Sequence, residues 1–246
     1  MEKILREFER IDDLQWKGLR IIQNSNMFCF GTDAVLLSHF AGIRKGDKVV
    51  DLGTGTGIIP VLLAGRMEDA CIYGLEIQPD MVEMANRSIL LNQLQSRVKI
   101  IEGDIRQAAE ILGRGQYTLV VSNPPYKKLG TGLVNPQDVK NIARHEIMCT
   151  LDDVLLSASL LLKAGGRFAM VHRPDRMIDI IEGMRKVCLE PKRIRMVHSH
   201  VNKPPILVLV EGVLHGRPFL NWMPPLIMYD ENQEYTPELK VIYHME

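Results

Sequence analysis

The stretch from Lys48 to Arg66 limits the possible folds more than any other part of the chain. An apolar run over 48–52 is followed by Gly53-Thr54-Gly55-Thr56-Gly57 and then by a helical pattern that carries Pro60 in its first turn. Proline is tolerated there because the first N–H groups of a helix have no partner within the helix. The order of strand, glycine turn and helix is repeated further along the chain. This repetition predicts an open α/β fold with a parallel sheet and right-handed crossovers.

The other elements follow from apolar runs and helical spacing. Seven strands are predicted, at 48–52, 70–75, 98–101, 117–121, 167–172, 192–198 and 206–213. Helices are predicted at 58–66, 79–92, 107–112, 151–162 and 174–187, and a further helix is expected before residue 40 with a Thr or Asp as its cap. Residues 14–23 suggest a small hairpin, and the first thirteen residues a short mobile helix or arm. We expect three parts: an N-terminal extension over 1–44, a main domain over 45–215, and a C-terminal arm over 216–246 that packs on this domain.

Composition sets limits on partners and location. The chain has 246 residues, of which 46% are hydrophobic, and 30 Lys+Arg balance 30 Asp+Glu. A nucleic-acid partner would therefore need a local basic patch, because the net charge neither favours nor excludes one. The four cysteines form no Cys-x-x-Cys pair, which suggests neither a zinc site nor a disulfide framework. A charged N-terminus and the lack of a long apolar run predict a cytoplasmic protein without a membrane span. No metal is expected, because His198-Ser199-His200 has no evident third ligand.

Polar residues end four of the predicted strands. They are Asp51 with the glycine turn, Glu76, Asp104 after Gly103, and Asn123. The carboxyl ends of parallel strands share one edge of a sheet, where ligands bind, so one site could hold all four. The glycine turn favours close approach of a ligand and an anion at the following helix N-terminus. By itself it also fits a plain tight connection or a dinucleotide fingerprint.

The tetrapeptide Asn123-Pro124-Pro125-Tyr126 follows the fourth predicted strand. Two prolines give an extended backbone whose carbonyls are available to accept hydrogen bonds, and Asn and Tyr add an amide oxygen and a flat ring. The tetrapeptide can therefore hold a planar amine, although an ordinary proline turn that closes a strand is the alternative. Glu76 suits a ribose diol, as in NAD enzymes, whereas a dehydrogenase needs neither Asp104 nor this tetrapeptide.

Taken together, these motifs resemble, in order and spacing, the class I S-adenosylmethionine methyltransferases that modify exocyclic or amide nitrogens. The resemblance implies a Rossmann-like, seven-stranded and mostly parallel sheet whose last strand is antiparallel. It also implies S-adenosylmethionine as the cofactor, with the methionine part held by Asp51 and the glycine turn and the target nitrogen held by Asn123 and Pro124. Tyr126 would stack on the target base. The cofactor-binding residues implied are Phe30, Gly31, Thr32, Asp33, Asp51, Gly53, Thr54, Gly55, Gly57, Glu76, Ile77, Asp104, Ile105 and Asn123.

The chain is more closely similar to the bacterial tRNA adenine-N6 methyltransferases that modify the adenosine 3′ of the valine anticodon. The supporting segments are Gln23 with 28–34, Ala143-Arg144-His145-Glu146, and His172-Arg173-Pro174. A tRNA substrate is implied, and no obligate protein partner is evident. The residues proposed to contact this substrate are Lys127, Lys128, Arg144, His145, Arg193 and Arg195.

Other readings remain open at this point. The same chemistry could act on a guanine N2 of rRNA, a DNA adenine, or a protein glutamine. The glutamine enzymes carry a sizeable helical domain before the core, whereas only about 45 residues precede Lys48 in this sequence. The fold could also serve as a non-catalytic RNA-binding module. His145 and Glu146 could be a plain surface pair, and the basic run 185–195 could be a solvated face.

Overall fold

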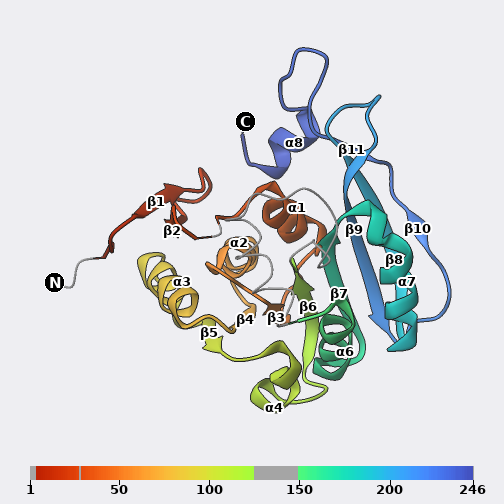
Figure 1. Ribbon diagram of the computed structural model, residues 1–246, viewed down its shortest axis with the longest axis horizontal. Helices are drawn as coiled ribbons and strands as arrows, with labels where there is room; N and C mark the ends of the chain where they lie inside the picture. Colours follow the sequence, from red (N-terminus) through yellow and green to blue (C-terminus); the bar gives the residue numbers. More distant parts are fainter. Residues whose placement is uncertain (1–3, 28, 125–148, 246) are drawn as a thin grey trace.

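The computed structural model describes residues 4–27, 29–124 and 149–245, and its centre is one large sheet (Figure 1). The sheet contains β3 (Lys48–Leu52), β4 (Cys71–Glu76), β5 (Val98–Glu102), β6 (Tyr117–Ser122), β7 (Leu162–His172), β8 (Leu189–His198) and β9 (Pro205–Leu214). Their spatial order is β8-β9-β7-β6-β3-β4-β5, and β9 runs antiparallel to both of its neighbours. The predicted α/β fold with seven strands and an antiparallel last strand is confirmed.

Helices cover both faces of this sheet (Figure 1). One face carries α1 (Thr32–Phe40), α2 (Ile58–Arg66), α3 (Pro79–Leu91) and α8 (Pro237–Ile242). The other carries α4 (Ala108–Leu112), α6 (Leu151–Leu161) and α7 (Met177–Lys186). Val49 packs into the first of these two cores and Val50 into the second, because successive side chains of a strand point to opposite faces. Burial on both faces explains why the strands read as continuous apolar runs.

The N-terminal residues form a hairpin that the sequence only partly predicts. β1 (Glu9–Asp13) pairs antiparallel with β2 (Arg20–Asn24), so the expectation of a short mobile helix or arm before residue 14 is wrong over β1. β1 is rich in charged residues, and the apolar Ile11 packs beside α3. The strand is therefore stabilised by contacts with α3 that its own sequence does not reveal.

Several element boundaries also differ from the predicted ones. β7 begins at Leu162, whereas the sequence predicts a turn up to residue 166, and its pairing with β6 is irregular between Tyr117 and Leu119. Two short 3-10 helices, η1 (Ile105–Gln107) and η2 (Pro174–Arg176), precede α4 and α7. The C-terminal arm adds β10 (Asn221–Trp222) and β11 (Leu226–Ile227), both parallel to β8, so the sheet has nine strands within the described residues, two more than predicted.

The arm also places α8 against α1 and β11. The division into 1–44, 45–215 and 216–246 stays a prediction. In the part of the chain that the structure describes, no helix is both long and apolar enough to cross a membrane.

Candidate active site

Three strands end side by side at the carboxyl edge of the sheet. Leu52 of β3 lies between Leu75 of β4 and Ser122 of β6 in the strand register. The Ser122 hydroxyl donates to the Leu52 carbonyl at 2.9 Å, so Asn123 leaves the sheet next to the start of the glycine turn. Backbone N–H groups of Gly53 and Thr54 both donate to the Leu75 carbonyl, at 2.9 and 3.0 Å. The turn therefore folds back over the end of β4.

The glycines of this turn serve two different purposes. Gly53, Gly55 and Gly57 all have positive φ, at 74°, 55° and 80°, a region that L side chains rarely adopt. A Cβ at Gly57 would lie 3.2 Å from the Ala85 Cβ, so this glycine lets α2 approach α3 closely. A Cβ at Gly55 would meet nothing within 4 Å. The backbone at Gly55 therefore faces open space that a ligand can enter.

Asp51 is the most unusual side chain of the site. It is 0% exposed, and neither of its carboxylate oxygens has a hydrogen-bond partner. Loss of hydration raises the pKa of Asp51 to about 7, and the negative charge of Glu76 adds to the rise. The nearby Thr54 hydroxyl opposes the rise without forming a hydrogen bond of good geometry. Buried polar groups are normally paired, so an orphaned carboxylate at the ligand edge of a sheet fits a cationic ligand group.

Glu76 is also buried, but its carboxylate is well supplied with donors. One oxygen accepts from the Gly55 N–H at 2.9 Å, and the other accepts from the Gln78 backbone and side chain at 3.0 and 3.2 Å. These bonds hold the glycine turn against the end of β4. A carboxylate has about four acceptor positions, so Glu76 keeps capacity for a diol. Ile77, the next predicted cofactor residue, is half-buried.

Asp104 and Ile105, the next predicted cofactor contacts, lie at the start of η1. Asp104 caps this turn by accepting from the Arg106 N–H at 2.8 Å, and its carboxylate also pairs with the Arg106 guanidinium. The hydrogen bond to that guanidinium lowers the pKa of Asp104. Ile105 is anchored by its carbonyl, which accepts from the Ser157 hydroxyl at 2.7 Å. Its side chain reaches the turn, because a Cβ at Gly53 would lie 3.7 Å from the Ile105 Cδ1.

The segment Phe30-Gly31-Thr32-Asp33 leads into α1 at the same end of the sheet. The two residues that follow α1 lie beside β7 at the level of the start of β6, since the carbonyls of Ala41 and Gly42 accept from Arg167, the partner of Leu119, at 2.8 and 3.0 Å. α1 therefore runs opposite to the parallel strands, and its first residues point toward their carboxyl edge. The Phe30 N–H donates to the Gln23 side chain at 2.9 Å.

The predicted catalytic and substrate residues are only partly visible. Asn123 and Pro124 directly follow β6. The remaining ones lie outside the described residues, namely Pro125, Tyr126, Lys127, Lys128, Arg144 and His145.

The two described substrate candidates, Arg193 and Arg195, lie on β8, which β7 and β9 separate from β6. Arg193 pairs with Glu211 at 2.7 Å, and Arg195 pairs with Glu238 at 2.7 Å. The run 185–195 is therefore opposed by more than Glu190, and its contact with RNA stays a prediction.

His172 is a candidate that sequence reasoning noted without assigning it a role. It ends β7, next to the end of β6, and is 2% exposed. Its Nδ1 accepts from the Arg173 N–H at 2.8 Å, and burial lowers its pKa to about 4. The imidazole is therefore neutral at pH 7. A polar residue directly after the apolar run 168–171 was the available signal.

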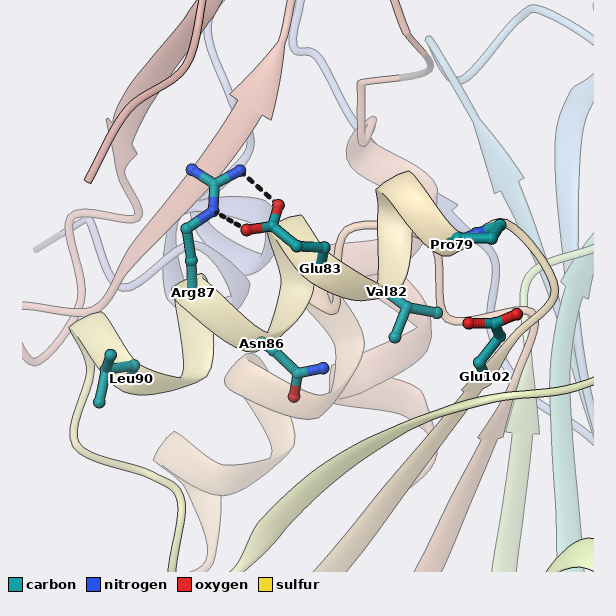
Figure 2. A pocket seen from close by; sticks show the side chains of 7 residues that line it. All are labelled: Pro79, Val82, Glu83, Asn86, Arg87, Leu90 and Glu102. Atoms are coloured by element: carbon teal, nitrogen blue, oxygen red, sulfur yellow. Dashed lines mark hydrogen bonds and ion pairs between the residues drawn. The ribbon is translucent and has the colours of Figure 1, made fainter. Parts of the chain in front are cut away.

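Two further features concern the surface. A groove of about 440 Å³ lies along the outside of α3. Figure 2 shows the residues that line it, namely Pro79, Val82, Glu83, Asn86, Arg87, Leu90 and Glu102. None of the predicted cofactor residues lines it. Within the described ranges, no three His, Cys, Asp or Glu side chains gather in a way that could hold a metal ion.

Comparisons with known proteins place the chain in a family. The family model "Methyltransferase small domain" matches residues 18–187. A protein of Porphyromonas gingivalis named tRNA1(Val) (adenine(37)-N6)-methyltransferase is 31% identical over 238 residues, which cover 92% of this chain and 91% of the relative. A protein of the same name from Pedobacter heparinus is 29% identical, with 93% of this chain and 94% of the relative covered.

Among solved structures, a predicted O-methyltransferase of Agrobacterium tumefaciens superposes with a TM-score of 0.71 at 23% identity, with 87% and 96% of the two chains covered. This likeness concerns the fold. The family model covers more than half of the chain, and the first relative covers nearly all of it at 31% identity. The chain therefore belongs to the methyltransferase small domain family, which confirms the S-adenosylmethionine-dependent N-methyltransferase predicted from its motifs.

Proposed function

We propose that this enzyme transfers a methyl group from S-adenosylmethionine to the exocyclic N6 of an adenosine in tRNA, namely adenosine 37 of the valine tRNA in its relatives' names. The observation that carries the proposal is the extent of the match. Relatives with that name align with more than nine-tenths of this chain, beyond the 18–187 of the general family model. The likeness therefore includes the parts outside the common core, where substrate choice is expected to lie. A tRNA substrate implies action in the cytoplasm.

The described residues fit the proposed cofactor. S-adenosylmethionine supplies a sulfonium-bound methyl group and carries a cationic amino group on its methionine part. The orphaned carboxylate of Asp51 suits that amino group, and the open backbone at Gly55 leaves room beside it. Glu76 would accept from the ribose hydroxyls, while Asp104 and Ile105 would bind the adenine.

Asn123 and Pro124 would hold the acceptor. The amino nitrogen of adenine is a poor nucleophile because its lone pair is delocalised into the ring. If the Asn123 amide oxygen and the Pro124 carbonyl each accept one N–H, the nitrogen is drawn toward tetrahedral geometry and its lone pair is aimed at the methyl group. Alignment of this kind supplies several kcal/mol without a strong base. The methylated nitrogen is acidic and loses its proton to water or to a carbonyl relay.

The base must leave its stack to reach this position. Flipping costs a few kcal/mol and is cheapest in a loop, such as the anticodon loop. Pro125 and Tyr126 complete the proposed binding surface for the base, on which the Tyr126 ring would stack. Lys127 and Lys128 follow at once and are proposed to contact neighbouring phosphates.

The test uses a valine tRNA transcript without modifications and S-adenosylmethionine labelled in its methyl group. We expect label in N6-methyladenosine after digestion to nucleosides, and loss of this label in Asn123→Ala with cofactor binding retained. A tRNA variant with guanosine in place of adenosine 37 serves as the control and should take up no label. Label found in guanosine, or only in protein, would refute the proposal.

A further inference from the structure

We propose that Gln23 is a positioning residue that holds the Phe30–Asp33 segment beside the cofactor, and that the N-terminal hairpin holds Gln23 in place. The inference rests on the proposed cofactor site. It concerns a residue of the hairpin, outside the sheet edge where the cofactor motifs lie. Its basis is a chain of hydrogen bonds from α3, through β2, to the backbone of Phe30.

The Gln23 side chain is buried, and both its amide oxygen and its amide nitrogen form hydrogen bonds. It is 2% exposed; its amide oxygen accepts from the Phe30 N–H at 2.9 Å, and its amide nitrogen donates to an Asp12 carboxylate oxygen. Asp12 in turn pairs with Arg10 at 2.8 Å. An Asp carboxylate can only accept and a backbone N–H can only donate. The amide of Gln23 therefore has one possible orientation. An ionised carboxylate, an ammonium group or an apolar side chain at this position could not make both bonds.

The hairpin that carries Gln23 is fastened to α3. Glu9 of β1 is paired with both terminal nitrogens of Arg87, at 2.6 and 2.7 Å, and its side chain is only 4% exposed. The free edge of β2 is satisfied by side chains of the same helix. The Ser88 hydroxyl accepts from the Ile22 N–H at 3.0 Å, and Asn92 bonds the N–H and the carbonyl of Arg20 at 2.8 and 2.6 Å.

These contacts give Gln23 a fixed position relative to the cofactor motifs. α3 begins at Pro79, three residues after Glu76, whose carboxylate holds the glycine turn. At the end of the segment that joins β2 to α1, α1 starts after Gly31 without a side-chain cap. Local capping therefore does not fix the start of α1, and the bond from the Phe30 N–H to Gln23 supplies a restraint from outside. Loss of this bond should loosen Phe30–Asp33, which are among the proposed cofactor-binding residues.

A purely structural role would look different in solution. If Gln23 only stabilised the hairpin, any change that weakens the hairpin equally would have the same effect on cofactor binding. Asn92→Ala is the matched control, because it removes only the two hydrogen bonds at Arg20, the first residue of β2. The bond from Ile22 to Ser88 and the Glu9–Arg87 pair still fasten the hairpin, and the bond from the Phe30 N–H to Gln23 is untouched.

The test measures the Kd of S-adenosylmethionine by calorimetry, together with the melting temperature, in the purified full chain. Gln23→Met keeps the volume and removes both hydrogen bonds, and we expect the Kd to rise roughly five- to tenfold. Turnover at saturating cofactor should stay within about threefold of the unchanged enzyme, because the reacting groups are not touched. Asn92→Ala should lower the melting temperature by a similar amount while the Kd stays within about twofold.

A charge swap tests the direction of the bonds. Gln23→Glu places a carboxylate against Asp12, and we expect it to weaken cofactor binding at least as much as Gln23→Met. The double variant D12N/Q23E reverses the donor and the acceptor between the two positions while the bond from Phe30 is kept. Its Kd should return to within about twofold of the unchanged enzyme.

The possible failures are distinguishable. If the unchanged enzyme does not bind S-adenosylmethionine, the proposed function itself is refuted and this inference falls with it. If the unchanged enzyme binds the cofactor and Gln23→Met binds equally well, only this inference is overturned. The same holds if Asn92→Ala weakens binding as strongly as Gln23→Met, or if D12N/Q23E binds no better than Gln23→Glu.

Discussion

Asp47 and Asp51 stand at opposite ends of β3, and both are buried, yet their surroundings differ completely. Asp47 is 7% exposed and accepts from the Thr118 hydroxyl at 2.7 Å, from the Arg44 N–H at 2.7 Å and from Arg167 at 2.8 Å. Asp51 is 0% exposed and has no hydrogen-bond partner on either oxygen. Burial alone therefore does not distinguish a structural carboxylate from one proposed to bind a ligand. What distinguishes them is whether the protein itself supplies the partners.

The network around Asp47 links three elements. Arg167 is 7% exposed, lies 3.7 Å from Glu211 as well as 2.8 Å from Asp47, and donates to the carbonyls of Ala41 and Gly42, which directly follow α1. This end of the sheet is complete without a ligand. The opposite end keeps a polar group unsatisfied, which lowers the stability of the free protein and favours binding.

The largest expected effect on stability comes from removing Arg167, the partner of Asp47. Arg167→Met leaves Asp47 and Glu211 without this partner in a buried setting, and it frees the carbonyls of Ala41 and Gly42. We expect the free energy of unfolding to fall by about 3–5 kcal/mol, measured by urea denaturation. Arg185→Met is the control, because the exposed pair with Glu190 should contribute less than about 1 kcal/mol. A loss below about 1 kcal/mol for Arg167→Met would show that the network is not structural.

The next prediction is a gain in the free energy of unfolding, and it concerns Asp51. The folded pKa of about 7 lies above the ordinary value of 3.8 for an Asp carboxyl, so ionisation of Asp51 costs stability as the pH rises between these values. Asp51→Asn should raise the free energy of unfolding of the ligand-free protein by about 1–3 kcal/mol at pH 8. The gain should shrink toward pH 5, because Asp51 is then neutral in the folded state.

Cofactor affinity should fall in the same Asp51→Asn variant, since the neutral amide cannot pair with a cation. Urea denaturation at pH 5 and pH 8 and calorimetry with S-adenosylmethionine measure the two effects. A variant that is less stable than the unchanged protein at pH 8 would contradict the comparison.

Glu76 lies between the two extremes, because its partners are present but belong to the binding loop. Glu76→Gln turns one acceptor into a donor that faces the N–H of Gly55 or of Gln78. We expect a stability loss of about 1 kcal/mol and a cofactor Kd raised roughly tenfold or more. Gln78→Ala removes only the bond at 3.2 Å and should leave the Kd nearly unchanged. Equal loss of affinity in the two variants would argue against a ribose contact by Glu76.

The smallest effect is expected at Ser122, a buried polar group of the binding end that is already paired. Ser122→Ala removes its bond to the Leu52 carbonyl and should cost about 0.5–1.5 kcal/mol of stability. Because Ser122 has its partner within the protein, the cofactor Kd should change less than twofold. A larger change in the Kd than in stability would mean that pairing within the protein does not separate the two classes of polar group.

Much of this architecture could be predicted from the sequence, and the reason is physical. Strands buried on both faces give apolar runs, and glycine turns with positive φ mark the connections, so the sheet and the positions of Asp51, Glu76 and Asp104 follow from local pattern. β1 does not, because its charged sequence is stabilised by Arg87, 78 residues from Glu9. The start of β7 was also missed, since Gly165 and Gly166 indicate a turn when read locally.

At the candidate site, the sequence predicts which residues lie at this edge of the sheet better than it predicts their surroundings. The motifs indicate which residues meet, but not that Asp51 would lack partners while Glu76 would have three donors. Likewise, the basic run 185–195 gives no sign that Glu211 and Glu238 pair with Arg193 and Arg195, because these acids come from other elements. Partners that are distant in sequence are what local pattern cannot supply.

Proton exchange on cofactor binding tests the account most directly. With a pKa of about 7, Asp51 is mostly protonated at pH 6, and a cationic ligand group should draw it into the charged form. Calorimetry of S-adenosylmethionine binding in buffers of different ionisation enthalpy should then show release of most of one proton per site at pH 6 and much less release at pH 7.5. Asp51→Asn should show no release at either pH. Binding to the unchanged enzyme without proton release at pH 6 would contradict the role assigned to Asp51.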